Sequence, residues 1–144
     1  MDFKSIVAVV ADDITAVDTI IATSLHSRIP LISEVGQYIV RGGGKRLRPL
    51  VCLLAARACG YREGDHHIRV AGIIELLHTA TLLHDDVVDV SALRRGRVTA
   101  NAQWGNAPSV LVGDFLYSRA FQMLVALGDM QIMSVMADTT NTIA

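Results

Sequence analysis

The sequence is poor in the residues that mark disulfide-rich, zinc-binding and β-rich proteins. Its two cysteines, Cys52 and Cys59, are seven residues apart, so the chain has no Cys-x-x-Cys spacing for zinc. We interpret them as buried free thiols in a reducing compartment. Val, Ile and Thr do not alternate between Asn-Gly or Asp-Gly turns, which argues against β-hairpins. These absences leave a helical protein as the interpretation.

Charge and long apolar runs are also scarce. Only 19% of the 144 residues are charged and the net charge is −1, so nothing attracts nucleic acid globally, and we expect no nucleic-acid partner. A membrane span needs about 18 or more consecutive apolar residues. The richest stretch, 70–90, is interrupted by Glu75, His78 and three aspartates. The N-terminal apolar run, 6–11, is too short for a signal peptide. We therefore expect a cytoplasmic protein without a membrane span.

Apolar residues recur at helical spacing along the whole chain, which predicts an all-α fold. Glycines 42–44 break the pattern, and we expect residues 90–107 to be irregular. The longest helix is apolar nearly all round, which is typical of a buried central helix. The pattern is still helical at residue 144, so we expect residues 1–144 to be the N-terminal part of a single domain. Five of the six predicted helices span 6–25, 31–40, 67–89, 108–127 and 129–144, and the sixth has Pro49 in its first turn and runs to about residue 58.

Two aspartates near the end of the longest helix form the strongest chemical motif. Asp85 and Asp89 are four residues apart and lie on one helical face, where they repel unless a cation binds between them. Ligands that are all oxygen favour Mg²⁺. A solvated helix end is the alternative, although negative charge there opposes the helix dipole. His78 is seven residues before Asp85, on the same face. It either donates a hydrogen bond to a phosphate or is an ordinary core histidine.

Seven of the 13 basic residues lie in two short segments, 41–48 and 94–97. The first joins three glycines to Lys45 and Arg48 just before a helix, where free amides and the helix dipole favour an anion. It is not a Walker A loop, because Arg46 follows the lysine. The second segment contains arginines, which bind phosphate through two parallel hydrogen bonds. Both segments have plainer alternatives, a glycine hinge and a surface loop, respectively.

Four motifs in order resemble the trans-type polyprenyl diphosphate synthases: Gly-Gly-Gly-Lys-Arg-Leu-Arg-Pro (42–49), Leu-Leu-His-Asp-Asp-Val-Val-Asp (82–89), Arg-Arg-Gly (94–96) and Val-Gly-Asp-Phe-Leu-Tyr-Ser-Arg-Ala-Phe (112–121). The resemblance implies an isoprenoid synthase-type helical bundle around a central cavity, and a homodimer at full length. It also implies a Mg²⁺-dependent transferase that joins isopentenyl diphosphate to an allylic prenyl diphosphate by ionisation, condensation and elimination. By this resemblance, isopentenyl diphosphate is held by Lys45, Arg48, His78 and Arg95.

The same resemblance assigns Arg94 to the allylic diphosphate. It assigns Asp85 and Asp89 to Mg²⁺, with Asp86 supporting them as a third catalytic carboxylate. Product length in the family is set just before the first aspartate motif, where Ala80 and Thr81 are both small. Small residues there imply a long product of roughly eight isoprene units, although close helix packing explains them equally well.

One part of the family pattern is missing from this sequence. The resemblance calls for a second aspartate-rich motif on later helices, and Asp129 and Asp138 are isolated. We therefore expect a chain truncated to about its first six helices, with little activity alone. Two other interpretations stay open. One is a non-catalytic partner subunit of a heteromeric synthase, and the other is a helical module that binds a diphosphate without chemistry.

Overall fold

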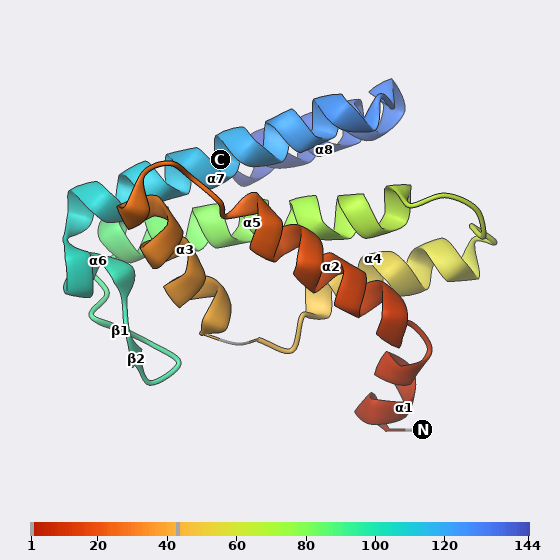
Figure 1. Cartoon of the computed structure of the whole chain (residues 1–144), viewed down its shortest axis with the longest axis horizontal. Helices are drawn as coiled ribbons and strands as arrows, with labels where there is room; N and C mark the ends of the chain where they lie inside the picture. The colour runs from red at the N-terminus through yellow and green to blue at the C-terminus, as the bar shows by residue number, and fades with distance from the viewer. Residues whose placement is uncertain (1, 43) are drawn as a thin grey trace.

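The computed structural model describes residues 2–42 and 44–144. Within them the chain forms eight helices and one short hairpin (Figure 1). The predicted helical fold is confirmed, with more helices than the six expected. The elements are α1 (Phe3–Ala8), α2 (Ala11–Ser24), α3 (Pro30–Arg41), α4 (Leu47–Ala58), α5 (His66–Val88), β1 (Leu93–Arg94), β2 (Arg97–Val98), α6 (Ala100–Trp104), α7 (Asn106–Leu127) and α8 (Met130–Ile143).

Helix α5 is the centre of the fold. It packs against α7 on one side and against α2 and α4 on the other, while α6 lies near its C-terminal end (Figure 1). This arrangement explains why α5 is apolar nearly all round, as the sequence indicated. Each fully buried large side chain stabilises the fold by about 1.5–3 kcal/mol. Those with essentially no exposed surface include Ile73, Leu76 and Leu83 of α5, Ile21 of α2, Leu53 of α4 and Leu116 of α7.

The prediction of a single helix over 6–25 was wrong. A capping box starts α1 at Phe3, because Asp2 accepts from the Ser5 amide at 2.8 Å and the Ser5 hydroxyl accepts from the Asp2 amide at 3.1 Å. A second helix then begins at Ala11. The apolar spacing continues across the break, since Val10 and Val17 are both buried, and so it could not reveal two helices.

The expected break between α3 and α4 is confirmed at its two ends, Arg41 and Leu47, although Gly43 lies outside the described residues. Helix α4 begins at Leu47, and Pro49 occupies its first turn as predicted, where proline is tolerated. Arg46 immediately precedes it with φ +47°, in the left-handed region.

The stretch 90–107, predicted to be irregular, contains the hairpin and α6. Strands β1 and β2 pair Arg94 with Arg97, so Arg95 and Gly96 form a two-residue turn. Their φ values of +51° and +75° are those of a type I′ turn. The prediction against β-hairpins was therefore wrong. Arginine occupies the first position of the turn where Asn or Asp is usual, and a side chain in the left-handed region costs about 1–2 kcal/mol.

Among the described helices, α7 is long and apolar enough to cross a membrane by length and composition. The core helix of a larger fold passes the same test. Helix α7 carries Asp114 and Arg119, and its buried side chains pack on α5. Core packing therefore accounts for its composition.

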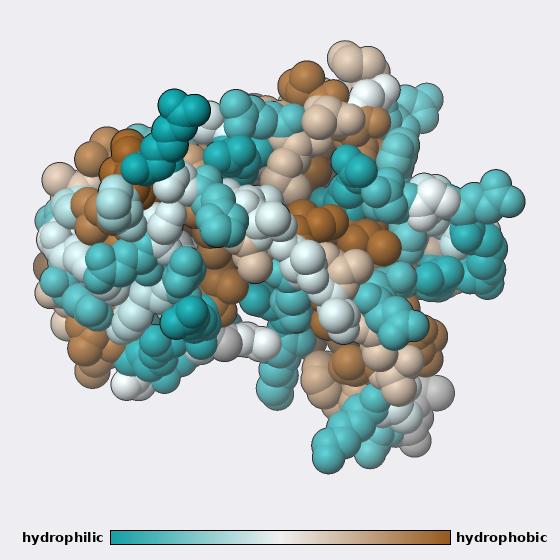
Figure 2. Space-filling model, viewed as in Figure 1, coloured by the Kyte–Doolittle hydropathy of each residue, from teal (hydrophilic) through white to brown (hydrophobic). Residues whose placement is uncertain are grey.

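Part of the apolar surface stays uncovered. Figure 2 shows hydrophobic side chains interspersed with hydrophilic ones on one face of the molecule. Exposed large apolar residues include Val51, Val125, Met130 and Val135. Cys59 is exposed too and Cys52 is half-buried, so the expectation of two buried thiols was wrong.

Candidate functional site

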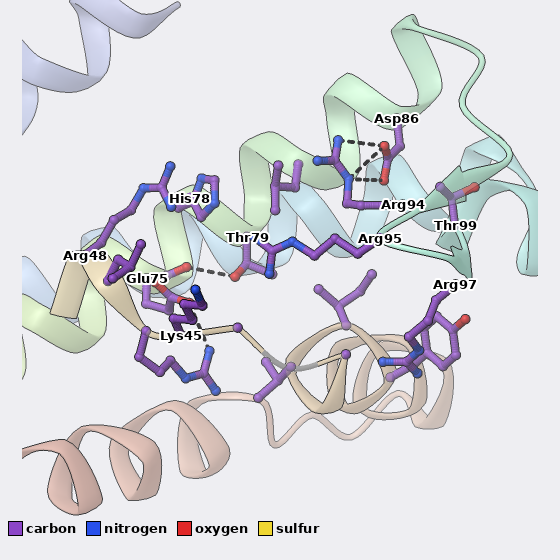
Figure 3. Close-up of a pocket in the computed structure, with 18 of the residues that line it drawn as sticks. Lys45, Arg48, Glu75, His78, Thr79, Asp86, Arg94, Arg95, Arg97 and Thr99 are labelled. Carbon is purple, nitrogen blue, oxygen red and sulfur yellow. Dashed lines mark hydrogen bonds and ion pairs between the residues drawn. The ribbon is translucent and has the colours of Figure 1, made fainter. Parts of the chain in front are cut away.

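The two basic segments predicted from the sequence line one cavity of about 500 Å³ (Figure 3). Its walls come from the end of α3, the loop before α4, one face of α5 and the hairpin. Positive charge dominates the described lining, because the carboxylates there are Glu75 and Asp86 alone. A cavity of this kind attracts a small, highly charged anion. The cationic lining residues are Lys45, Arg46, Arg48, Arg94, Arg95 and Arg97.

Helix α5 contributes side chains at helical spacing to the cavity: Glu75, His78, Thr79, Leu82 and Asp86. His78 is about half-buried. Burial lowers its pKa below the ordinary value of 6.5, and the positive charge of Arg48 lowers it further. His78 is therefore neutral at pH 7. A neutral imidazole can donate one hydrogen bond to an anion without adding to the crowded positive charge.

Asp86 and Arg94 form an ion pair at the wall of the cavity. The Asp86 side chain is only 4% exposed, and the Arg94 guanidinium donates to it through Nη2 at 2.8 Å and through Nε at 3.1 and 3.2 Å (Figure 3). This carboxylate raises the pKa of Arg94. Asn101 of α6 donates to the Asp86 carbonyl at 3.2 Å. Asp86 therefore ties the hairpin and α6 to α5.

Asp85 and Asp89 lie one turn apart, as predicted. Asp89 follows the last residue of α5, and its amide donates to the Asp85 carbonyl at 2.8 Å. Both residues are exposed, and the cavity lining does not include them. The described residues contain no group of three or more His, Cys, Asp or Glu side chains arranged around a metal. Two open carboxylates nevertheless fit Mg²⁺, which binds few carboxylates and fills its other positions with water and phosphate oxygens.

The predicted chain-length residues also lie outside the cavity lining. Ala80 is fully buried in the core, and Thr81 is half-buried, with its hydroxyl donating to the His78 carbonyl at 2.8 Å. Their proposed role in product length stays a prediction.

No pattern in the sequence indicated a contact between Tyr38 and the hairpin. The Tyr38 hydroxyl donates to the Val98 carbonyl at 2.7 Å, and the Arg97 guanidinium lies 4.5 Å above the Tyr38 ring. A Cβ at Gly42 would lie 2.7 Å from Arg97 Nη1, so glycine leaves room for this stack. These residues are far apart in sequence, and only the tertiary fold brings them together.

Arg46 and Glu75 are two further lining residues to which the sequence analysis assigned no role. Arg46 Nη1 donates to Glu75 Oε1 at 2.9 Å. Glu75 lies three residues before His78 on the same helix, so its helical spacing could have placed it at the site. Arg46 belongs to the basic segment that had already been singled out.

Comparison with known proteins gives one consistent family. The family model described as polyprenyl synthetase matches residues 29–144. The octaprenyl diphosphate synthase of Escherichia coli strain K12 is 54% identical over 144 residues, covering 100% of this chain and 44% of the relative. The octaprenyl diphosphate synthase of Haemophilus influenzae is 56% identical over 132 residues, covering 92% of this chain and 40% of that relative.

Solved structures agree with these sequence relatives. A decaprenyl diphosphate synthase from Rhodobacter capsulatus superposes with a TM-score of 0.92 at 45% identity, covering 96% of this chain and 42% of that one. A polyprenyl synthase from Caulobacter crescentus CB15, complexed with calcium and isoprenyl diphosphate, also superposes with a TM-score of 0.92. Its sequence is 41% identical, and the match covers 97% of this chain and 42% of that one. The chain thus spans less than half the length of these relatives.

Proposed function

This chain belongs to the polyprenyl synthetase family, and from that premise we propose that it carries the isopentenyl diphosphate site and the first magnesium-binding aspartates of a long-chain polyprenyl diphosphate synthase. The observation that carries the proposal is the cavity, because it gathers Lys45, Arg48, His78 and Arg95 from three separate parts of the chain.

The diphosphate of isopentenyl diphosphate binds among these four side chains. Lys45 and Arg48 come from the loop before α4 and its first turn, His78 from α5, and Arg95 from the hairpin turn. In Figure 3, Arg95 extends from the hairpin toward Thr79, across the cavity from Lys45. Arginine and lysine neutralise the diphosphate, and the neutral His78 donates a single hydrogen bond.

The allylic diphosphate binds next to Arg94, near Asp85 and Asp89. These two carboxylates would hold Mg²⁺, which supplies positive charge to the leaving diphosphate. Asp86 keeps Arg94 in a fixed orientation through their ion pair. Arg94 is still 40% exposed in its side chain, so one side of the guanidinium can face a substrate.

The reaction follows from this placement of two diphosphates. The allylic C–O bond breaks, and the diphosphate leaves with the bonding electrons, stabilised by Arg94. The double bond of isopentenyl diphosphate then attacks the allylic carbon, and the released diphosphate takes up the proton whose loss forms a new double bond. The product is five carbons longer. Leu82 and Ile39 give the cavity an apolar wall that limits access of water to the cation.

We extend the proposal to the product and to the whole protein. The names of the relatives and the small residues Ala80 and Thr81 support an all-trans product of about eight isoprene units. We propose that residues 1–144 are the N-terminal part of one domain, that the complete enzyme is a cytoplasmic homodimer, and that the isolated chain turns over little. The relatives' greater length supports the proposal that residues 1–144 are part of a longer domain.

The test is Mg²⁺-dependent elongation by the full-length gene product, with an allylic diphosphate and labelled isopentenyl diphosphate. Product length is read by mass spectrometry. We expect Lys45→Ala and Arg48→Ala each to raise KM for isopentenyl diphosphate by roughly ten- to a hundredfold, the value of a lost charge-assisted hydrogen bond. Arg62→Ala, an exposed arginine outside the cavity, is the matched control. Mg²⁺-dependent diphosphate binding without turnover by the full-length protein would instead indicate a binding module.

A further inference from the structure

Two carboxylates hold Arg46, one of the cationic residues that line the cavity. Its Nη1 donates to Glu75 of α5 at 2.9 Å, and its Nε donates to Asp18 of α2 at 3.1 Å. The Arg46 side chain is 19% exposed and that of Glu75 is 12% exposed, whereas Asp18 is 52% exposed. Much of the guanidinium's hydrogen-bonding capacity is therefore directed toward the protein rather than toward a ligand.

The backbone at Arg46 also needs support. Its φ of +47° and ψ of +39° place it in the left-handed region, which costs a non-glycine residue about 1–2 kcal/mol. Such strain persists where surrounding contacts over-determine the conformation. The Arg46 carbonyl accepts from the Leu50 amide at 2.9 Å and so starts α4. The contacts of its side chain with Asp18 of α2 and Glu75 of α5 hold the same residue in place in addition to this backbone hydrogen bond.

The two residues proposed to bind diphosphate, Lys45 and Arg48, flank Arg46 in sequence. A change in the orientation of Arg46 would redirect both of them, because they share its short loop and the first turn of α4. The Lys45 ammonium also lies 6.0 Å from the centre of the Phe3 ring in α1. Both N-terminal helices therefore contact this segment.

Glu75 would oppose anion binding if its charge were unpaired, since it lines the cavity three residues before His78. Arg46 neutralises this carboxylate at 2.9 Å. Asp18 provides the second contact that keeps the guanidinium in place. Glu75 thus acts as an anchor for the loop without repelling the substrate.

We propose that Arg46 is a positioning residue, held by Asp18 and Glu75, that presents Lys45 and Arg48 to the diphosphate. The helix α2, which lies outside the matched family region 29–144, thereby contributes to substrate binding through Asp18. This inference rests on the proposed function, because it specifies how the same site is built.

The direction in which Asp18→Asn changes the affinity for diphosphate distinguishes a positioning role from a simple electrostatic effect. Asp18→Asn removes a negative charge near an anion site, so simple electrostatics predicts tighter binding of inorganic diphosphate. Positioning predicts weaker binding, by about two- to fivefold, the range expected for an exposed ion pair. Asp12→Asn removes the same charge from an exposed position on α2 that has no such contact, and it is the matched control.

The binding is measured by calorimetry on the full-length protein with inorganic diphosphate in the absence of Mg²⁺, so that the metal-dependent site at Asp85 and Asp89 does not contribute. Arg46→Gln should weaken binding more than Asp18→Asn, because it leaves Glu75 unpaired in the cavity. In the double variant, Asp18→Asn should have no further effect, since its partner is gone. In steady-state assays, both single variants should raise KM for isopentenyl diphosphate and leave kcat within about twofold.

Lys45→Ala, measured in the same series, distinguishes failure of this inference from failure of the proposed function. Unchanged diphosphate binding by Lys45→Ala would overturn the proposed site itself. Weaker binding by Lys45→Ala, together with unchanged or tighter binding by Asp18→Asn, would overturn only the positioning role. Additive effects of Asp18→Asn and Arg46→Gln would also overturn it.

Discussion

Replacing Gly113 by alanine tests how closely α7 approaches the aspartate-rich end of α5. A Cβ at this position would clash with Nε2 of His84 and lie 2.6 Å from its Cδ2, closer than real Cβ atoms approach other heavy atoms. The imidazole would have to move. It would then lose its contacts with the Val110 carbonyl and with Asp114 Oδ1, each at 3.3 Å.

The size of the effect follows from two opposing contributions. Overpacking of a tight contact costs about 1–3 kcal/mol. Alanine in a helix interior gains about 1 kcal/mol over glycine. The Gly113→Ala variant should therefore be destabilised by roughly 0–2 kcal/mol. In a His84→Ala background the ring is absent, so the same substitution should stabilise the protein by about 1 kcal/mol.

The assay is urea unfolding of four proteins: the wild type, each single variant and the double variant. The coupling free energy between positions 84 and 113 should be about 1–3 kcal/mol. Alanine at 113 should destabilise the protein, or have no effect, when His84 is present, and should stabilise it when His84 is replaced by alanine. If Gly113→Ala stabilised both backgrounds equally, the close contact between the imidazole and α7 would be refuted.

Three further substitutions probe the site and its strained backbone. Asp86→Asn should destabilise the protein by about 1–3 kcal/mol in thermal unfolding, less than a fully buried ion pair because Arg94 is 40% exposed; an unchanged Tm would contradict the buried pair. The lowered pKa of His78 means that the unfolded state binds its proton at higher pH, so wild-type stability should fall as pH drops through about 6.5. His78→Gln should lose this part of the pH dependence between pH 7 and 5 in urea midpoints, and identical profiles would contradict the assignment. Val90→Gly should raise stability by about 0.5–1 kcal/mol, because Val90 has φ +52° and is 83% exposed; a lower Tm would show that its side chain is needed.

The helices could be predicted from the sequence because their signals are local. The apolar spacing of α5 and α7 and the glycines before α4 located these elements to within a few residues. The hairpin could not be predicted, because its type I′ turn uses Arg95 where Asn or Asp is usual. The break between α1 and α2 was also invisible, since the same apolar face continues through it.

The site was predictable in its composition but only partly in its geometry. The family resemblance assigned Lys45, Arg48, His78 and Arg95 to one anion site, and the structure brings them to one cavity. The sequence could not show that Asp86 is committed to Arg94. That pairing depends on the path of the hairpin, which no local pattern encodes. The functional roles of these residues stay predictions.

The two-residue turn of the hairpin has a consequence for how this enzyme family can vary. Surface loops usually accept insertions at little cost. Here Arg94 is fastened to α5 through Asp86, whereas Arg95, one residue later, has Nη1 only 3.1 Å from where a Gly44 Cβ would be. One added residue would shift the strand register and move Arg95 away from Gly44. The length of the hairpin thus sets where Arg94 and Arg95 lie. We expect insertions or deletions in it to be tolerated as poorly as the loss of either charge.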